Sequence, residues 1–281
     1  MKKILVTGAT GQLGSELSVL SSSYPQYEWI FADRTKISLD DLDKLSSQLN
    51  EIKPDIIFNC GAYTAVDKAE SERDLAFRIN HLAVESLAKY AAANNVKLIH
   101  ISTDYVFDGS SSIALSEEAG TNPINVYGES KLAGEIACLK ENPNAIIIRT
   151  SWVYSTFGNN FVKTMQRLMQ EREELNVVND QIGSPTYAAD LAQAMIDIIE
   201  FRAWVPGIYH YSNEGEISWY EFALSIKDLG DYNCKVRGIP SSSYTTPAKR
   251  PNFSLLDKTK IKSVYNLEVP YHKESLKKMF V

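Results

Sequence analysis

The chain has 281 residues, of which 44% are hydrophobic and 23% are charged, and its formal net charge is -6. This length is enough to bury one large core or two smaller ones, and a mildly acidic surface argues against broad binding to nucleic acid or to membranes. The three cysteines (Cys60, Cys138 and Cys234) lie far apart, which favours reduced thiols over a disulfide framework. We therefore expect a cytoplasmic globular protein. The four histidines share no ligand spacing, so we expect no metal site.

The first 150 residues alternate short apolar segments with longer helical patterns. The expected strands are Lys3–Val6, Trp29–Ala32, Asp55–Asn59, Lys97–Ser102 and Ala145–Arg149. The expected helices are one that begins at about Gln12, then Asp40–Asn50, Asp74–Asn94 and Tyr127–Lys140. Strands of this length that alternate with helices are typical of a parallel sheet covered on both faces. The pattern predicts an α/β fold with a Rossmann-like, doubly wound parallel sheet.

After Thr150 the rhythm of the elements changes. Helices are expected at about Asn160–Arg172, Ala188–Phe201 and Trp219–Leu229, with strands at Leu175–Val178 and Gly207–Tyr211 and a Pro/Ser-rich stretch at Pro240–Pro251. We interpret residues 151–281 as mainly a smaller C-terminal α/β lobe that binds the substrate. No flexible linker separates it from residues 1–150, so the boundary is approximate and segments of the two parts can interleave.

Three glycines, Gly8, Gly11 and Gly14, directly follow the first expected strand and open the first expected helix. Glycines at such a turn let the backbone approach a pyrophosphate closely, and the free N–H groups of the helix N-terminus attract its charge. Asp33 ends the second strand, where an acid can bind an adenosine ribose, and the guanidinium of Arg34 suits a 2′-phosphate. Residues 1–150 are therefore predicted to be an NAD(P)-binding Rossmann domain that takes NADPH or NADH.

Tyr127 and Lys131 lie four residues apart, so on a helix their side chains share one face. Reduction of a ketone needs a proton for its oxygen, and a cation near a tyrosine lowers the pKa of the phenol. We therefore predict that Tyr127 is the general acid and that Lys131 adjusts its pKa. Thr103, at the carboxyl end of the fourth strand, can hydrogen-bond the ketone oxygen.

Longer motifs resemble those of the extended short-chain dehydrogenase/reductase superfamily and, within it, the dTDP-4-dehydrorhamnose reductase family. They are Asn59–Glu70, Ser102–Gly109, Arg149–Tyr154, Gly158–Phe161, Asp180–Thr186, and Arg250–Pro251 with Ser254 and Leu256–Asp257. The resemblance spans nearly the whole chain. It implies NAD(P)H-dependent reduction of the C4 keto group of dTDP-4-dehydro-L-rhamnose to dTDP-L-rhamnose, a step in nucleotide-sugar biosynthesis.

The resemblance also implies roles for individual residues. Those that match the family's cofactor site are Gly8, Gly11, Gln12, Leu13, Asp33, Ala62, Tyr63, Thr64, Tyr127 and Lys131, beside which we place Arg34. Those that match its sugar-nucleotide site are Thr103, Asp104, Tyr105 and Trp152, with Val66 and Asn160 as looser assignments.

The chain departs from the family pattern at several positions. Cys60-Gly61 replaces an alanine pair, and Ser38 replaces an acid that follows the second strand. Glu16 matches one ligand of a magnesium ion that bridges some family dimers, but Ala189 replaces another. We therefore expect a monomer or homodimer without bridging magnesium. Two alternatives remain: a related nucleotide-sugar reductase or epimerase, and a non-catalytic regulatory subunit that resembles the partner of methionine adenosyltransferase.

Overall fold

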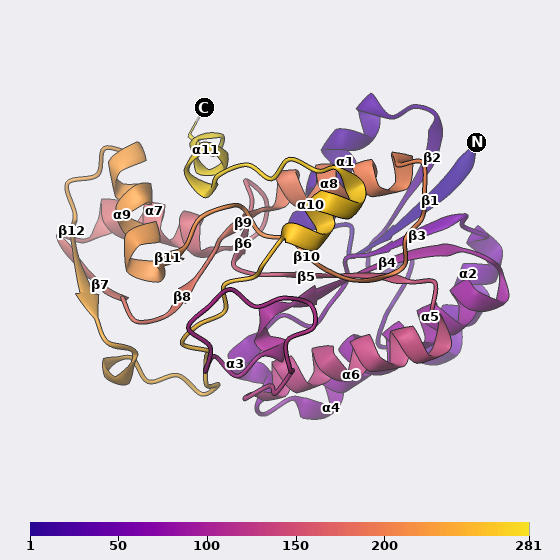
Figure 1. Ribbon diagram of the computed structural model, residues 1–281, viewed down its shortest axis with the longest axis horizontal. Helices are drawn as coiled ribbons and strands as arrows, with labels where there is room; N and C mark the ends of the chain where they lie inside the picture. Colours follow the sequence, from indigo (N-terminus) through magenta and orange to yellow (C-terminus); the bar gives the residue numbers. More distant parts are fainter. Residues whose placement is uncertain (281) are drawn as a thin grey trace.

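The computed structural model describes residues 1–280, whose centre is a parallel sheet (Figure 1). The sheet has six strands in the order β10-β5-β4-β3-β1-β2. Their bounds are β1 Lys2–Thr7, β2 Tyr27–Ala32, β3 Ile56–Asn59, β4 Lys97–Thr103, β5 Ile146–Thr150 and β10 Gly207–His210. The chain runs from β1 outward to β2 and returns to β3 on the other side of β1. This reversal is the topological switch point of a doubly wound sheet, so the predicted fold is confirmed.

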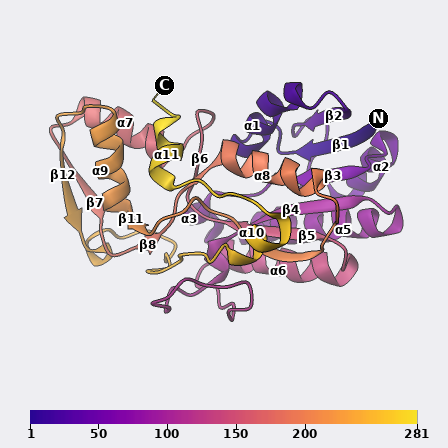
Figure 2. The same ribbon diagram turned by 45° about the horizontal axis from the view of Figure 1, so that its top comes forward.

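Helices cover both faces of the sheet, as Figures 1 and 2 show. One face packs against α1 (Gln12–Leu20), α8 (Ala188–Glu200) and α10 (Thr259–Tyr265). The other packs against α2 (Leu42–Ile52), α5 (Ala83–Ala93) and α6 (Val126–Glu141). Because successive strand residues point to opposite faces, Ile146 and Ile148 join the first core and Ile147 joins the second. Apolar runs rather than alternating patterns are therefore needed in these strands.

Two elements from the second half of the chain belong to this sheet. β10 pairs with β5 in parallel, with Gly207 opposite Ile146, and α8 shares the core beneath the sheet with α1. The division of the chain at residue 150 stays a prediction. If it is kept, β10 and α8 are segments of the second half that pack with the first.

A second core lies at the other end of the molecule (Figure 1). It is formed by α7 (Phe161–Glu171), α9 (Trp219–Leu229) and α11 (His272–Lys277) packed against the parallel pair β7 (Glu174–Val178) and β12 (Lys235–Ile239). Two short pairs adjoin it: β6 (Val153–Tyr154) with β9 (Thr186–Tyr187), and β8 (Ile182–Gly183) with β11 (Ile217–Ser218).

Some elements differ from those expected. The single helix expected over Asp74–Asn94 is α4 (Arg73–Phe77), a π-helical turn η2 (Arg78–Leu82) and α5. Sequence patterns missed α3 (Val66–Ala69), α10, α11 and β12, and in β12 only Val236 is buried, so the strand has no apolar run. Short 3-10 turns occupy η1 (Ser21–Ser23), η3 (Asp104–Val106) and η4 (Ser241–Ser243). Within residues 1–280, no helix is both long and apolar enough to cross a bilayer.

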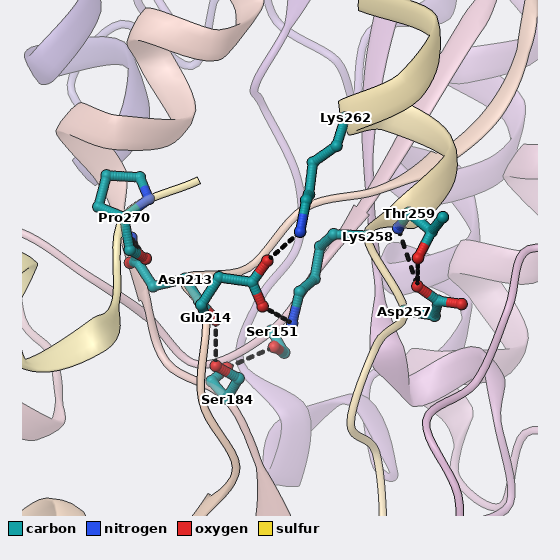
Figure 3. Close-up of polar contacts among 9 residues, drawn as sticks. All are labelled: Ser151, Ser184, Asn213, Glu214, Asp257, Lys258, Thr259, Lys262 and Pro270. Atoms are coloured by element: carbon teal, nitrogen blue, oxygen red, sulfur yellow. Dashed lines mark hydrogen bonds and ion pairs between the residues drawn. The ribbon is translucent and has the colours of Figure 1, made fainter. Parts of the chain in front are cut away.

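Polar contacts fasten the C-terminal segment to the sheet (Figure 3). Glu214, which follows β10, pairs with Lys258 at 3.3 Å and with Lys262 of α10 at 2.7 Å. Nearby, the Ser151 hydroxyl donates to the Ser184 carbonyl at 2.6 Å. These contacts keep α10 against the sheet and hold the start of the second lobe close to the end of β5.

Candidate active site

The glycine loop lies at the carboxyl edge of the sheet, at the switch point between β1 and β3. Gly8 has φ +65°, and a Cβ there would lie 2.6 Å from the Gly61 Cα, so only glycine fits. A Cβ on Gly14 would lie 2.4 Å from the Gly8 carbonyl oxygen. Gly11 caps α1 without a side-chain hydrogen bond, which leaves the first N–H groups of α1 free for an anion. This backbone cradle fits a pyrophosphate, and Leu13 beside it is buried in the core.

Asp33 and Arg34 follow β2 beside this loop. One oxygen of Asp33, Oδ1, accepts hydrogen bonds from the Thr35 amide at 2.9 Å, the Thr35 hydroxyl at 2.6 Å and the Lys36 amide at 3.2 Å. These bonds lower the pKa of Asp33, chiefly through the Thr35 hydroxyl, so the side chain is a carboxylate at neutral pH. The side chain of Arg34 is exposed. A charged acid and a solvated cation are thus adjacent where the adenosine end is expected.

Tyr127, in the first turn of α6, is buried and lies beside Thr103, the last residue of β4. Burial raises the pKa of Tyr127 to about 12, nearby Asp104 raises it as well, and the Thr103 hydroxyl lowers it. Lys131, which we expected to lower this pKa, is not among these influences. The loss of hydration of the phenolate outweighs the other influences, so the phenol holds its proton at neutral pH.

Lys131 is 2% exposed, one turn further along α6. Its amino group donates to the Ile101 carbonyl at 2.7 Å and lies 3.4 Å from Nε2 of His100. Burial lowers the pKa of Lys131 to about 8, although Glu135 raises it. A lysine that carries its proton only loosely can take part in proton transfer near neutral pH.

Asp104 and Tyr105 complete the polar side of the site. Asp104 is 1% exposed, and burial raises its pKa to about 6, although the hydroxyls of Ser254 and Thr103 lower it. Tyr105 contacts Tyr127 edge to face, with ring centroids 5.5 Å apart. These contacts restrict the orientation of the Tyr127 ring.

The loop after β3 is held by a residue that sequence reasoning missed. Asn80, in the π-helical turn, accepts from the Tyr63 amide at 2.8 Å and donates to the Tyr63 carbonyl at 3.0 Å and to the Ser130 hydroxyl at 3.0 Å. Ser130 precedes Lys131 on α6, so Asn80 joins this loop to the helix that carries Tyr127 and Lys131. Asn80 falls inside the helix expected over Asp74–Asn94 and belongs to no recognisable motif, so its role could not be recognised from the sequence.

The other predicted residues of this loop lie around Tyr63. Its hydroxyl donates to Glu72 at 2.6 Å, which raises the pKa of Tyr63 to about 12. Ala62 and Val66 are half-buried, and Thr64 is exposed. Val66 packs in one apolar cluster with Tyr63, Tyr105 and Tyr127. The Val66 assignment therefore places an apolar side chain beside the predicted general acid.

Two further predicted residues, Trp152 and Asn160, lie in the second lobe. Trp152 has φ +48°, a strained conformation for a tryptophan, and its ring stacks on Trp219 with centroids 3.7 Å apart. Asn160 caps α7 by accepting from the Lys163 amide at 3.0 Å, and its amide group donates to Gln12 at 2.9 Å and to the Ser155 carbonyl at 2.7 Å. The side chains of Gln12 and Asn160 thus bind each other and join the cofactor loop to the second lobe.

Glu16, the residue that matches a magnesium ligand, is 5% exposed and accepts from the Ser155 hydroxyl at 2.6 Å. Burial raises its pKa, and the Ser155 bond lowers it. Among residues 1–280, no group of three or more histidine, cysteine or acidic side chains is placed to hold a metal ion.

Several known proteins are similar to this chain over nearly its whole length. A family model described as the RmlD substrate binding domain matches residues 1–281. The chain is 40% identical to a dTDP-4-dehydrorhamnose reductase of Aggregatibacter actinomycetemcomitans, covering 99% of this chain and 98% of the relative. It is 42% identical to the corresponding protein of Sinorhizobium fredii, covering 99% and 96%. A crystal structure of the Bacillus anthracis dTDP-4-dehydrorhamnose reductase in complex with NADP superposes with a TM-score of 0.95 at 39% identity, covering 100% and 99%.

The doubly wound sheet, its glycine loop and the Thr103–Tyr127–Lys131 arrangement define a Rossmann-like protein of the short-chain dehydrogenase/reductase type. Within that class, the chain belongs to the dTDP-4-dehydrorhamnose reductase family.

Proposed function

We propose that the protein reduces the C4 keto group of dTDP-4-dehydro-L-rhamnose to dTDP-L-rhamnose with NADPH or NADH. The relatives at about 40% identity carry that activity in their names, and the Bacillus anthracis relative is in complex with NADP. The observation in this chain that carries the proposal is the buried, protonated Tyr127 beside Thr103 at the carboxyl edge of β4, where doubly wound folds bind ligands.

In this proposal the glycine loop binds the cofactor pyrophosphate, and Asp33 and Arg34 contact its adenosine end. The bound cofactor supplies the hydride. Thr103 hydrogen-bonds the ketone oxygen, and Tyr127 donates the proton that this oxygen needs. Lys131 contacts the nicotinamide ribose and stabilises the phenolate that Tyr127 leaves behind. Ala62, Tyr63 and Thr64 line the nicotinamide side.

The sugar nucleotide binds between this edge and the second lobe. Asp104, Tyr105 and Val66 contact it from the sheet side, and Trp152 and Asn160 from residues 151–281. Residues 1–150 then form the cofactor domain and residues 151–281 mainly the substrate lobe. The strained Trp152 supports this assignment, because strained backbone is typical of ligand-binding positions.

The test is consumption of NADPH or NADH with dTDP-4-dehydro-L-rhamnose. We expect one cofactor oxidised per sugar reduced, with dTDP-L-rhamnose identified by chromatography. Release of a 4-epimer without net cofactor oxidation would favour an epimerase. Cofactor binding without turnover of this sugar would favour the regulatory-subunit alternative.

We also propose that the protein works in the cytoplasm as a monomer or homodimer. Cys60, Cys138 and Cys234 are free thiols, of which the last two are buried, as expected for a reducing compartment. Light scattering after size exclusion would measure the oligomeric state, and a mass of a trimer or larger assembly would contradict this part of the proposal.

A further inference from the structure

His100 is a fully buried histidine that the proposed reaction does not use. It lies on β4, and its Nδ1 accepts from the Asn59 side-chain amide at 2.9 Å. Its Nε2 lies 3.4 Å from the Lys131 amino group. Burial and the nearby Lys131 charge both hold the pKa of His100 well below its usual range, so the ring is neutral at physiological pH. Because Nδ1 accepts from Asn59, the proton of this neutral ring lies on Nε2, which faces the Lys131 amino group as a donor. The neutral amine of Lys131, whose pKa burial lowers to about 8, can accept from it.

A chain of hydrogen bonds fixes the His100 ring from behind. The Gly61 amide donates to the Thr7 hydroxyl at 3.2 Å, and that hydroxyl donates to Oδ1 of Asn59 at 2.7 Å. Thr7, Asn59 and His100 face one another in register across β1, β3 and β4. This series of hydrogen bonds thus crosses three paired strands at one level and begins at Gly61, which packs against Gly8 of the predicted cofactor loop.

The Lys131 amino group has two neighbours on β4, the His100 ring and the Ile101 carbonyl. The other titratable groups that face it are Cys60 after β3, and Cys138 and Glu135 on its own helix. Burial raises the pKa of both thiols, so they are neutral, and Glu135 is held by Arg149 at 2.6 Å. A flexible four-carbon side chain needs such contacts to keep its amino group in one place.

We propose that His100 is a positioning residue of the reduction, which holds the Lys131 amino group against β4 and is itself held by the Asn59–Thr7 chain. This proposal rests on the proposed function, because Lys131 acts on Tyr127 and on the cofactor ribose only in that reaction. It connects the cofactor loop with the catalytic helix through three side chains.

Two isosteric variants separate the two contacts of the ring. The amide of His100→Asn lies near the position of Nδ1, so it keeps the contact with Asn59 and removes the one with Lys131. The amide of His100→Gln reaches the position of Nε2 and keeps a polar contact with Lys131. We expect His100→Asn to lower kcat by about 2- to 10-fold, as for the loss of one hydrogen bond between neutral groups, with little change in sugar KM. His100→Gln should retain most of the activity.

A pH profile gives a readout that does not need turnover. Burial is the main cause that lowers the Lys131 pKa to about 8. The smaller side chain of His100→Asn admits water beside Lys131, so this pKa rises and the alkaline loss of NADPH affinity moves to higher pH. Nicotinamide fluorescence across pH 6–10 measures it. Thr7→Val keeps the side-chain shape but removes the hydroxyl that bonds Asn59. It should move the pH profile in the same direction by a smaller amount.

His210→Asn is the matched control, because His210 is also fully buried but contacts the Leu115 carbonyl from β10. It should lower Tm and leave the pH profile unchanged. The proposal is overturned if His100→Asn and His100→Gln lower kcat and Tm equally with unchanged pH profiles, since His100 would then support only the fold. If the wild type binds NADPH but does not reduce the keto sugar, the proposed function fails, while the NADPH-binding profiles still test the contact between His100 and Lys131.

Discussion

In the proposed reaction, the ketone receives its proton from Tyr127, a single phenol whose high pKa keeps it protonated. Tyr127→Phe removes this proton and little else, since the ring still packs against Tyr105. We expect kcat to fall on the order of 10²–10⁴-fold, with NADPH affinity nearly unchanged. The control is Tyr90→Phe, which removes another buried hydroxyl, one that donates to the Leu49 carbonyl. A Tyr127→Phe variant with most of its turnover would remove Tyr127 from the mechanism.

We propose that cofactor choice also depends on single side chains. In this proposal Asp33 repels a 2′-phosphate and the exposed Arg34 attracts it, so we expect use of both NADH and NADPH with selectivity of no more than about 1–2 kcal/mol. Asp33→Asn should weaken NADH use more than NADPH use, because it removes the charge that binds the ribose and repels the 2′-phosphate. Its amide oxygen can still accept the Thr35 and Lys36 bonds, so the loop keeps its shape. Arg34→Ala should do the reverse. Kinetic constants for both cofactors check this, and an unchanged ratio in both variants would place the adenosine end elsewhere.

At the scale of elements, the start of α6 decides where Tyr127 lies. Asn125 caps this helix by accepting from the Gly128 amide at 2.8 Å, and it donates to the Lys249 carbonyl at 2.7 Å. Asn125→Ala should lower the free energy of unfolding by about 1–2 kcal/mol and also lower kcat, because the first turn carries Tyr127, the proposed general acid. Denaturant unfolding and steady-state kinetics measure the two effects.

Asp41→Ala provides the comparison, since Asp41 caps α2 by accepting from the Lys44 amide at 3.3 Å, on a helix without predicted site residues. It should cost stability alone. Equal kcat in both variants would mean that α6 keeps its first turn without the cap.

Local patterns predicted the elements that depend on local physics. The apolar runs of β1 and β3–β5 and the glycine turn before α1 are visible because buried parallel strands and a pyrophosphate cradle each need particular residues in consecutive order. The four-residue spacing of Tyr127 and Lys131 likewise follows from one helix.

Contacts between distant segments could not be predicted in this way. Gln12 and Asn160 bind each other from elements far apart in the chain, and the sequence pattern of each indicates only a ligand contact or a helix cap. The sequence pattern gives no sign of the position of His100 beside Lys131, because its neighbours Asn59 and Lys131 meet it only through the strand register and the packing of α6. The burial that raises the Tyr127 pKa is likewise a property of the folded chain.

For the whole molecule, buried histidines make stability depend on pH. His272, at the start of α11, is fully buried, and among residues 1–280 no protein group hydrogen-bonds either ring nitrogen. Burial lowers its pKa to about 4, so the unfolded chain, with a pKa near 6.5, binds the proton more readily. Its contribution to stability is complete above about pH 6.5 and is lost as the pH falls toward 4.

His272→Leu removes this penalty. We expect the variant to gain on the order of 1–2 kcal/mol relative to the wild type between pH 7.5 and pH 5. Urea unfolding at both pH values measures the difference. If the difference in the free energy of unfolding between the two proteins is the same at both pH values, His272 does not titrate on unfolding in this range.

The pairing of β10 with β5 has a consequence for how the chain is made. On the ribosome, β5 emerges with its apolar Ile146, Ile147 and Ile148 while one edge lacks a partner, and residues 207–210 follow only after much of the second lobe has been synthesised. α8, which covers the first face, also arrives in that interval. A fragment of residues 1–150 should therefore aggregate when expressed alone, which sedimentation of the lysate would reveal. We therefore expect the growing chain to need chaperones, or slow translation, to keep this edge from pairing with a neighbouring nascent chain.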